Sequence, residues 1–362
     1  YKTKLDQNGM LDKPKVRIVY RGDLDKISKP QDIDPWNPHA NFLSLKFYLA
    51  VCAGLDISTW QADLIQAYVN VPIKHARVFI QFPNYWKPYV PAELKKYIGV
   101  PLEVLKALYG WHLSGLCLYE AMAEFFEEYG LKKSVMMGLW YMRLPDGGLL
   151  LILHYSDDCL SGSSNPEAHL AFRTAFARRF QVKWIPDASW YLSAHINRDA
   201  QGNYTLDQYR YSRAIVQRYL PNATNDPTAA ELRKYKDPLP REFEWSRSDD
   251  SATPAKVKAL ETEFGFRFPE VVGSLNYLSN TAIKMLFSIR RSSKYARQPG
   301  RKHFQGLLHM LHHLRCYPPA PLKFFKDVHT SPFAKMLRQA GLDKIDPTLV
   351  YIGDSAFMDL ED

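Results

Sequence analysis

Two adjacent aspartates, Asp157 and Asp158, are the residues of this chain best suited to chemistry. They follow the apolar run Leu149–Leu153, and Cys159 and Leu160 resume the apolar pattern. An apolar run, a polar tip and a second apolar run together predict a β-hairpin. Two negative charges beside a buried strand are costly unless a cation shares the site, and a pair of divalent ions needs carboxylates held in this way. The alternative is a solvated turn, because Asp favours turns for local reasons.

A third carboxylate, Asp63, ends another strand-like segment, which begins at Trp60. The residues that follow it include Ala67-Tyr68-Val69-Asn70. Together with Tyr155-Ser156-Asp157-Asp158, this pattern resembles the first and third motifs of reverse transcriptases. The order Asp, three residues, Ala, aromatic, aliphatic, Asn resembles most closely the copia type of long-terminal-repeat retrotransposon.

The resemblance implies an α+β fold, a right-handed polymerase with fingers, palm and a helical thumb. It also implies template-directed addition of deoxynucleotides to the 3′ end of a primer. Asp63 and Asp157 would hold two magnesium ions, for which manganese is a possible substitute, and Asp158 would support the site more weakly. The partners implied are an RNA or DNA template with its primer, and deoxynucleotide triphosphates.

Basic residues alternate with apolar ones near the N-terminus. Lys13, Lys15, Arg17 and Arg21 occupy alternate or nearly alternate positions, so one face of a predicted hairpin over residues 1–22 is cationic. An ordinary edge strand guarded by lysine is the alternative. The copia family has a similar basic pattern here, and the resemblance implies that Lys15 and Arg17 bind the incoming triphosphate, with Arg21 as a further candidate.

Two more residues are placed at the nucleotide by the resemblance. Tyr68 stands where the family's aromatic residue packs under the deoxyribose and leaves no room for a 2′ hydroxyl; a core aromatic is the alternative. The segment 105–112 is similar to the family's Leu-x-Lys-Ala/Ser-Leu-Tyr-Gly-Leu-Lys. Within it, Gly110 lacks a Cβ and would let the backbone approach a nucleotide or template base closely, although a glycine at the start of a helix is also common.

An acid-free segment gives the strongest sign of nucleic-acid binding. Residues 271–326 contain no Asp or Glu but ten Lys or Arg. A charge run is usually a solvated face, but one so one-sided would repel itself without an anionic partner. The residues expected to bind primer and template, the first two through the resemblance, are Tyr155, Trp190, Lys294, Arg297, Arg301 and Lys302.

Several positions depart from the family pattern, among them His112 where the family has Lys. Leu113 and Leu116 stand where the family has Gln and Arg, and Ser193 and His195 stand where it has Gly and Glu. These departures leave open a second function, that of a catalytically decayed or captured protein that binds nucleic acid or serves as a scaffold. Retention of all three aspartates favours the enzyme, because a scaffold gains nothing from a clustered negative site.

Composition bounds the setting of the chain. Its 362 residues carry a net charge of +9, with a pI near 9.1, which favours a polyanionic partner. The four cysteines form no CxxC pair, which favours a reducing intracellular location, cytoplasmic or nuclear. No apolar run approaches the roughly 20 residues that span a bilayer, so no membrane partner is expected. The oligomeric state stays open.

The predicted organisation follows the polymerase plan. We assign the fingers to 1–55 and 71–108, the palm to 56–70 and 109–204, the thumb to 205–318 with a flexible polar insertion at 221–262, and the truncated start of a ribonuclease H-like region to 319–362. Helices are predicted at 41–55, 118–130, 166–180 and 209–220, and again from Pro269. Asp354 matches the family's first ribonuclease H carboxylate, but its companions are absent, so residues 322–362 should pack as an appendage or fray, and RNA should not be cut. Since Tyr1 is not Met, the chain is expected to be excised from a longer protein.

Overall fold

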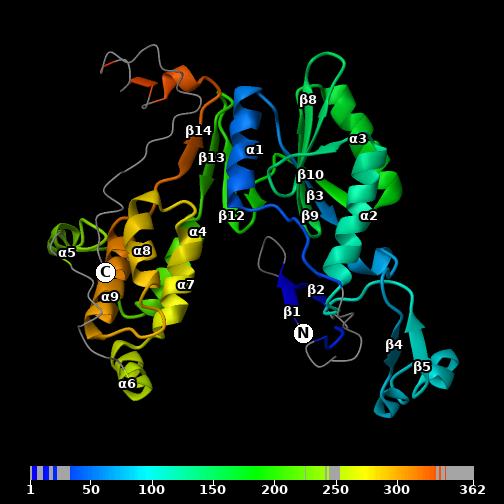
Figure 1. The fold of residues 1–362 in the computed structure, drawn as a ribbon, viewed down its shortest axis with the longest axis horizontal. Helices are drawn as coiled ribbons and strands as arrows, with labels where there is room; N and C mark the ends of the chain where they lie inside the picture. The colour runs from blue at the N-terminus through cyan, green and yellow to red at the C-terminus, as the bar shows by residue number, and fades with distance from the viewer. Residues whose placement is uncertain are drawn as a thin grey trace. The chain divides into compact units, whose positions relative to one another are not determined.

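A computed structural model describes residues 2–5, 11–15, 19–22, 33–224, 226–240, 243, 253–331, 334, 335 and 339. The chain divides into two compact units: unit 1 is Tyr1–Tyr48 with Ile57–Asp187, and unit 2 is Leu49–Asp56 with Ala188–Asp362. Both units contain helices and strands (Figure 1), consistent with the predicted α+β class. The assignment of fingers, palm and thumb stays a prediction.

A six-stranded antiparallel sheet forms the centre of unit 1, in the order β10-β3-β9-β8-β7-β6. Its strands are β3 (Trp60–Leu64), β6 (Lys132–Lys133), β7 (Leu139–Arg143), β8 (Leu149–Tyr155), β9 (Asp158–Ser163) and β10 (Val182–Pro186). Strands β8 and β9 confirm the predicted hairpin. The apolar run of β8 is explained by burial, because Leu150 to His154 are all buried.

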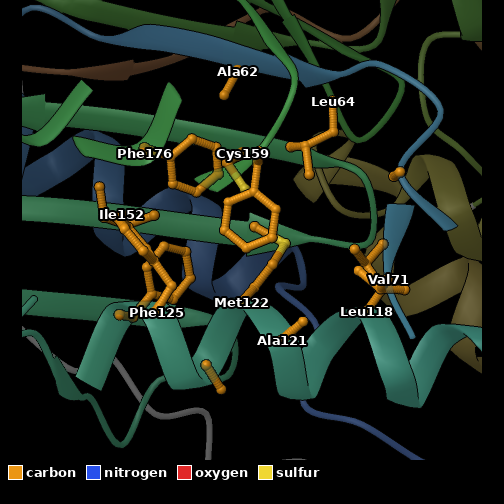
Figure 2. Close-up of a cluster of buried hydrophobic side chains, with 14 of the residues drawn as sticks. Ala62, Leu64, Val71, Leu118, Ala121, Met122, Phe125, Ile152, Cys159 and Phe176 are labelled. Atoms are coloured by element: carbon orange, nitrogen blue, oxygen red, sulfur yellow. The ribbon is translucent and has the colours of Figure 1, made fainter. Parts of the chain in front are cut away.

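Two helices cover this sheet, α2 (Ser114–Glu128) and α3 (Pro166–Arg179). Figure 2 shows Met122 and Phe125 of α2 directed toward Ile152 and Cys159 of the sheet and Phe176 of α3. Full burial of each such side chain contributes roughly 1.5–3 kcal/mol. Helix α3 begins where its signals predict, since the Asn165 side chain caps its first turn. Helix α2 begins earlier than the predicted residue 118.

Helix α1 (Phe42–Gly54) confirms a predicted helix, and the boundary between the two units falls within it. The remaining elements of unit 1 are small. They comprise the hairpins β1 (Lys2–Leu5) with β2 (Leu11–Lys15) and β4 (Val78–Gln81) with β5 (Pro101–Val104), and the 3₁₀ helices η1 (Tyr68–Asn70), η2 (Asn84–Trp86) and η3 (Ala92–Tyr97). Strand β2 ends at Lys15, and residues 19–22 are irregular, so the basic strand does not extend to Gly22 as predicted.

Unit 2 combines a four-stranded sheet with a helical bundle. The sheet has the order β11 (Trp190–Tyr191), β12 (Ala194–Arg198), β13 (Tyr204–Asp207), β14 (Leu322–Phe324). The helices are α4 (Tyr209–Tyr219), α5 (Ala229–Lys234), α6 (Pro254–Phe264), α7 (Phe268–Leu278), η4 (Ile283–Met285), α8 (Leu286–Ser293), α9 (Arg301–Cys316) and η5 (Val328–Thr330). The bundle has its own core, in which Phe268, Leu275 and Phe304 are fully buried.

Helices α5 and α6 contradict the prediction that residues 221–262 lack regular structure. Thr228 and Glu231 form a reciprocal capping box at the start of α5. At the start of α6, the Thr253 hydroxyl accepts a hydrogen bond from the Lys256 amide, and Pro254 occupies the first turn. Both start signals can be recognised in the sequence, but the polar composition of the region favoured the prediction of an insertion without helices.

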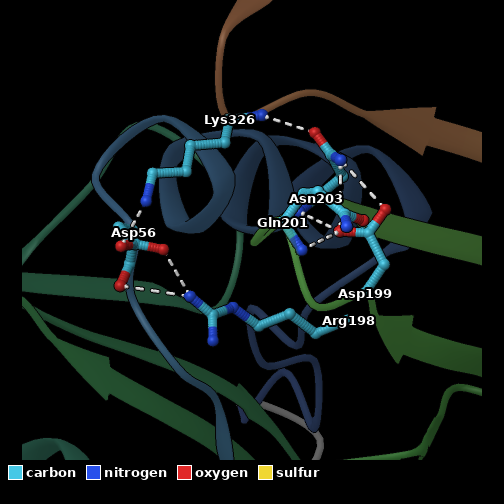
Figure 3. Close-up of polar contacts among 6 residues, drawn as sticks. All are labelled: Asp56, Arg198, Asp199, Gln201, Asn203 and Lys326. Carbon is cyan, nitrogen blue, oxygen red and sulfur yellow. Dashed lines mark hydrogen bonds and ion pairs between the residues drawn. The ribbon is translucent and has the colours of Figure 1, made fainter.

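Strand β14 is an integral part of unit 2, and not the appendage that was expected. Figure 3 shows how Lys326, two residues beyond this strand, is held. The Lys326 ammonium and the Arg198 guanidinium both bind the Asp56 carboxylate, and the Lys326 amide donates to Asn203 Oδ1 over 3.0 Å. The pKa of Asp56 is lowered, first by the hydrogen bond from Lys326. Asp354 lies outside the described residues.

Two further findings concern the cysteines and the length of the apolar helices. All four cysteines are free thiols, three of them buried. Within the described ranges, no helix combines the length and the apolar character that crossing a bilayer requires.

Candidate active site

The register of the central sheet brings the three predicted aspartates together. Asp63 of β3 lies directly opposite Asp158 of β9. Asp157 is the second residue of the two-residue turn between β8 and β9, and its carbonyl oxygen accepts a hydrogen bond of 3.2 Å from the Leu64 amide. Residues directly opposite in a sheet have Cβ atoms roughly 4.5–5.5 Å apart. Strand β3 and the hairpin therefore place three carboxylates at one edge of the pairing.

Alternation along β3 explains why Asp63 faces this site. Ala62 and Leu64 are buried in the core, so Gln61 and Asp63 lie on the other face. The Gln61 amide donates to both carboxylate oxygens of Asp158, over 2.9 and 3.1 Å. On the other side of β3, Lys183 of β10 lies opposite Asp63. The sequence analysis missed Gln61 and Lys183, although the alternation in 60–64 could have placed Gln61 on the aspartate face.

The carboxyl group of Asp158 has an unusual protonation equilibrium. Its pKa is raised from 3.8 to about 7, chiefly because burial penalises the charged form. The hydrogen bond from Gln61 opposes this shift, and repulsion by the charges of Asp157 and Asp63 adds to it. The site therefore holds more negative charge than its surroundings compensate.

The donor set fits a divalent cation. Carboxylate oxygens are the ligands that Mg²⁺ prefers, and a cation would relieve the repulsion that adds to the effect of burial on the Asp158 pKa. Across the part of the chain that the structure describes, no three His, Cys, Asp or Glu side chains converge in a metal-binding arrangement. The three aspartates thus share one neighbourhood, and their side chains would have to turn toward one another to hold an ion.

The raised pKa predicts a pH-dependent stability of the metal-free protein. Between pH of about 4 and 7 the folded chain binds a proton at Asp158 that the unfolded chain does not, so stability falls as pH rises through this window. Each pKa unit corresponds to about 1.4 kcal/mol, which sets an upper bound of about 4 kcal/mol. Chemical denaturation in chelator should show the free energy of unfolding decreasing from pH 5 to pH 8.

Asp158→Asn supplies the control for this pH dependence. The amide does not titrate, so the variant should lose this component of the profile and gain stability at pH 8 relative to the wild type. Matching profiles in the two proteins would show that the Asp158 carboxyl is ionised in the folded chain throughout.

The turn itself is held by residues from other segments. Ser156, its first residue, has a φ of 54°, in the left-handed region. The Ser156 hydroxyl and the Tyr68 hydroxyl are 2.7 Å apart, and the backbone of Ser156 is hydrogen-bonded by His39 and His154. Sequence reasoning identified neither histidine, because their approach to the turn depends on tertiary structure. Each is only a single polar residue in an apolar or irregular stretch.

Of the predicted nucleotide-binding residues, Tyr68 contacts this turn, and Gly110 follows Tyr109, whose ring packs against Tyr68. Tyr68 is half-buried in η1, and its ring packs edge-on against that of Tyr109 at 4.9 Å. Gly110 has a φ of +89°, and a Cβ there would collide with the Tyr20 carbonyl oxygen. The Tyr20 amide also donates to the Tyr109 carbonyl over 2.7 Å. A close approach of two backbone segments thus accounts for this glycine.

The structure describes only some of the basic residues that were predicted to bind the triphosphate. Arg21 is exposed in the irregular segment that contacts Gly110. Lys15 ends β2, of which the structure describes the backbone, and Arg17 lies outside the described residues.

The predicted primer and template contacts are divided between the units. Tyr155 belongs to unit 1, where it is 43% exposed and pairs with Asp158. In unit 2, Trp190 is exposed on β11 with the Arg210 guanidinium 5.7 Å from its ring centroid. The other four belong to the same unit: Lys294 and Arg297 are exposed before α9, Arg301 forms an ion pair with Glu263, and Lys302 lies 6.0 Å from the ring of Phe243.

Comparisons with known proteins agree with the geometry. The family described as reverse transcriptase (RNA-dependent DNA polymerase) matches residues 1–230. The chain is 22% identical over 322 residues to the retrovirus-related Pol polyprotein from transposon RE2 of Arabidopsis thaliana, and 22% identical over 315 residues to that from transposon RE1 of the same plant. Each alignment covers 87% of this chain and 20% of the polyprotein, so the chain spans about a fifth of the length of these relatives.

Proposed function

Since the chain belongs to the reverse transcriptase (RNA-dependent DNA polymerase) family, in its copia-type retrotransposon branch, we propose that it adds deoxynucleotides to a primer on an RNA or DNA template. The observation that carries this proposal is the register that sets Asp63 opposite Asp158 and Asp157 in the adjoining turn. An intracellular location, in the cytoplasm or the nucleus, is part of the same proposal.

The three carboxylates have separate roles in this proposal. Asp63 and Asp157 would hold two magnesium ions, and Asp158 would support them. When bound, two such ions supply activation of the primer 3′ hydroxyl and neutralisation of the leaving pyrophosphate. Gln61 orients the Asp158 carboxylate through both oxygens, and Lys183 brings a compensating positive charge to the strand beside Asp63.

Basic and aromatic residues would bind the nucleotide. Lys15, Arg17 and Arg21 would bind the triphosphate, where positive charge offsets the charge that develops during transfer. Tyr68 would pack under the sugar, and its hydroxyl is already fixed by Ser156. These contacts position the nucleotide relative to the carboxylates, which is the main contribution a protein makes to phosphoryl transfer.

Primer extension on an RNA template tests the proposal. The full chain, with magnesium and all four deoxynucleotides, should lengthen a labelled DNA primer, and excess chelator should stop it. A labelled RNA–DNA hybrid in the same buffer should stay intact. Absence of extension with both magnesium and manganese, together with binding of primer–template, would instead support the decayed, nucleic-acid-binding protein.

The burial of two departing residues favours that second function in part. Leu113 is fully buried and Leu116 half-buried in unit 1, so positions that are polar and basic in the family serve packing here. Ser193 has a φ of 54°, which explains why the family has Gly at its position, and it adopts that conformation as a serine. The departures therefore fit the fold, and only activity measurements separate the two functions.

The acid-free segment predicts a steep salt dependence of binding to primer–template. Each neutralised phosphate contributes roughly 0.9 to the log–log slope for B-form DNA. Lys294→Ala with Arg297→Ala should lower the slope by about 2 without changing sequence preference. Arg218→Ala is the matched control, because Arg218 lies in the same unit but outside the acid-free segment, and pairs with Glu270 at 3.2 Å. A flat salt response in the wild type would rule out a duplex-binding role for this segment.

A further inference from the structure

Two histidines bind the main chain of Ser156, the residue that precedes Asp157. The Ser156 amide donates to His39 Nδ1 over 3.2 Å, and His154 Nε2 donates to the Ser156 carbonyl oxygen over 2.7 Å. An amide can only donate and a carbonyl can only accept, so His39 Nδ1 carries no proton and His154 Nε2 carries one. Both main-chain polar groups of one turn residue are thus fixed by side chains from outside the turn.

The backbone conformation of Ser156 requires stabilisation by residues outside the turn. The turn contains only Ser156 and Asp157, and its first residue has a φ of 54°. Glycine is preferred where a hairpin turn requires positive φ at its first position, and a residue with a Cβ is less stable there by roughly 1–2 kcal/mol. Two hydrogen bonds to the same residue, each contributing roughly 0.5–1.5 kcal/mol, are of the size needed to offset that cost.

The side chain of His154 is held rigidly. It is fully buried among aromatic rings, with Tyr119 stacked at 6.0 Å and His39 edge-on at 5.5 Å. Burial lowers its pKa to about 4, so it stays neutral and keeps the proton that it donates. Burial also lowers the pKa of His39, which favours the neutral ring that accepts from Ser156.

The backbone reinforces the same arrangement. The His154 carbonyl accepts from the Ala40 amide over 2.9 Å, which fixes the segment that carries His39 beside β8. The His154 amide donates to the Gly138 carbonyl over 2.8 Å. Gly138 has a φ of +70°, and a Cβ there would lie 2.6 Å from the His154 carbonyl oxygen. Three segments of unit 1 therefore converge behind the turn.

We propose that His39 and His154 are positioning residues, which fix the peptide of Ser156 and thereby hold Asp157 in the orientation that metal binding requires. The inference rests on the proposed function, because it assigns Asp157 to the metal site. Both histidines act through the main chain of Ser156. Replacement of a residue that orients a metal ligand typically lowers metal affinity or activity by roughly 10- to 100-fold.

Paired variants separate hydrogen bonding from packing. His154→Leu fills a similar volume without a donor, whereas His154→Gln retains an Nε2 donor. His39→Leu removes the acceptor at a half-buried position, and His39→Asn restores one as Oδ1. His169→Leu is the matched control, since His169 is also a buried histidine of unit 1 but bonds the Ser161 hydroxyl at 2.9 Å, away from the turn.

The test is a Mn²⁺ titration of the full chain by electron paramagnetic resonance, with primer-extension kinetics alongside. His154→Leu and His39→Leu should raise the Mn²⁺ dissociation constant roughly 10- to 100-fold and lower kcat, with KM for primer–template unchanged. The Gln and Asn variants should recover most of the affinity. His169→Leu should lower the melting temperature without altering Mn²⁺ binding.

Each outcome decides one question. Unchanged Mn²⁺ affinity in folded His154→Leu and His39→Leu would overturn the positioning role and leave two packing residues. If His154→Leu does not fold, the half-buried His39 pair decides alone. Mn²⁺ binding that requires Asp157, without primer extension, would overturn the proposed function and leave the positioning role standing. Wild-type protein that binds no Mn²⁺ would overturn both.

Discussion

Asp157→Asn is expected to reduce primer extension by roughly a thousandfold or more, which corresponds to about 4 kcal/mol of lost transition-state stabilisation. Asparagine has the shape of aspartate but lacks its charge, so the variant weakens the proposed metal ligand while leaving the turn intact. The carbonyl of residue 157 still accepts from the Leu64 amide, because that bond belongs to the backbone. Asp63→Asn should have an effect of the same size.

The folded state should not suffer from this change. Asp157 is one of the charges that raise the Asp158 pKa, so its removal relieves repulsion and shifts that pKa downward. We expect the melting temperature of metal-free Asp157→Asn to equal or exceed that of the wild type. Extension rates and thermal unfolding in chelator are the two measurements. Near-normal extension by a folded Asp157→Asn protein would reject the assignment of this carboxylate.

Local patterns predicted the hairpin and the position of its aspartates. The run from Leu149 to Leu153 is continuous because β8 is buried on both faces, and such a run is recognisable without any alignment. The predicted polar tip, residues 155–158, then has to contain the turn, which the structure narrows to Ser156 and Asp157. The spacing of the motif identified Asp63 as a third candidate. Spacing alone could not predict that Asp63 lies opposite Asp158 in the sheet.

Contacts between distant segments escaped prediction. Lys183 reaches the neighbourhood of Asp63 only because β10 pairs with β3, and nothing near residue 183 marks it as different from other exposed lysines. His39 and His154 meet Ser156 through the tertiary packing of three segments. Strand β14 is three residues long, too short to carry a period, and it forms by pairing with β13.

The positive charge of the acid-free segment was overestimated from the sequence for a similar reason. The segment 271–326 has no acid of its own, but Glu263 of α6 lies outside it and forms an ion pair with Arg301. Glu231 of α5 likewise pairs with Arg315, which is almost fully buried. The surplus of positive charge predicted from sequence is thus reduced by partners from α5 and α6, and Glu231 of α5 belongs to the region that was expected to be a flexible insertion.

Tyr68→Val is expected to raise the use of ribonucleotides, relative to deoxyribonucleotides, by roughly 10- to 100-fold. The Tyr68 hydroxyl is fixed by Ser156 at 2.7 Å, and Tyr109 packs edge-on against its ring at 4.9 Å. These contacts give the ring one position, and a rigid ring excludes a 2′ hydroxyl better than a mobile one. Valine removes most of the ring and opens that space.

Tyr68→Phe separates the ring from its hydrogen bond. It keeps the bulk that would exclude the 2′ hydroxyl and loses only the contact to Ser156, so selectivity should stay within a few fold of the wild type. Single-nucleotide insertion kinetics with matched ribo- and deoxyribonucleotides measure the ratio for all three proteins. If Tyr68→Val folds and keeps wild-type selectivity, Tyr68 is a core aromatic, and the sugar must be read elsewhere. A loss of selectivity in Tyr68→Phe as large as in Tyr68→Val would instead make the hydrogen bond to Ser156, and not the bulk of the ring, the source of discrimination.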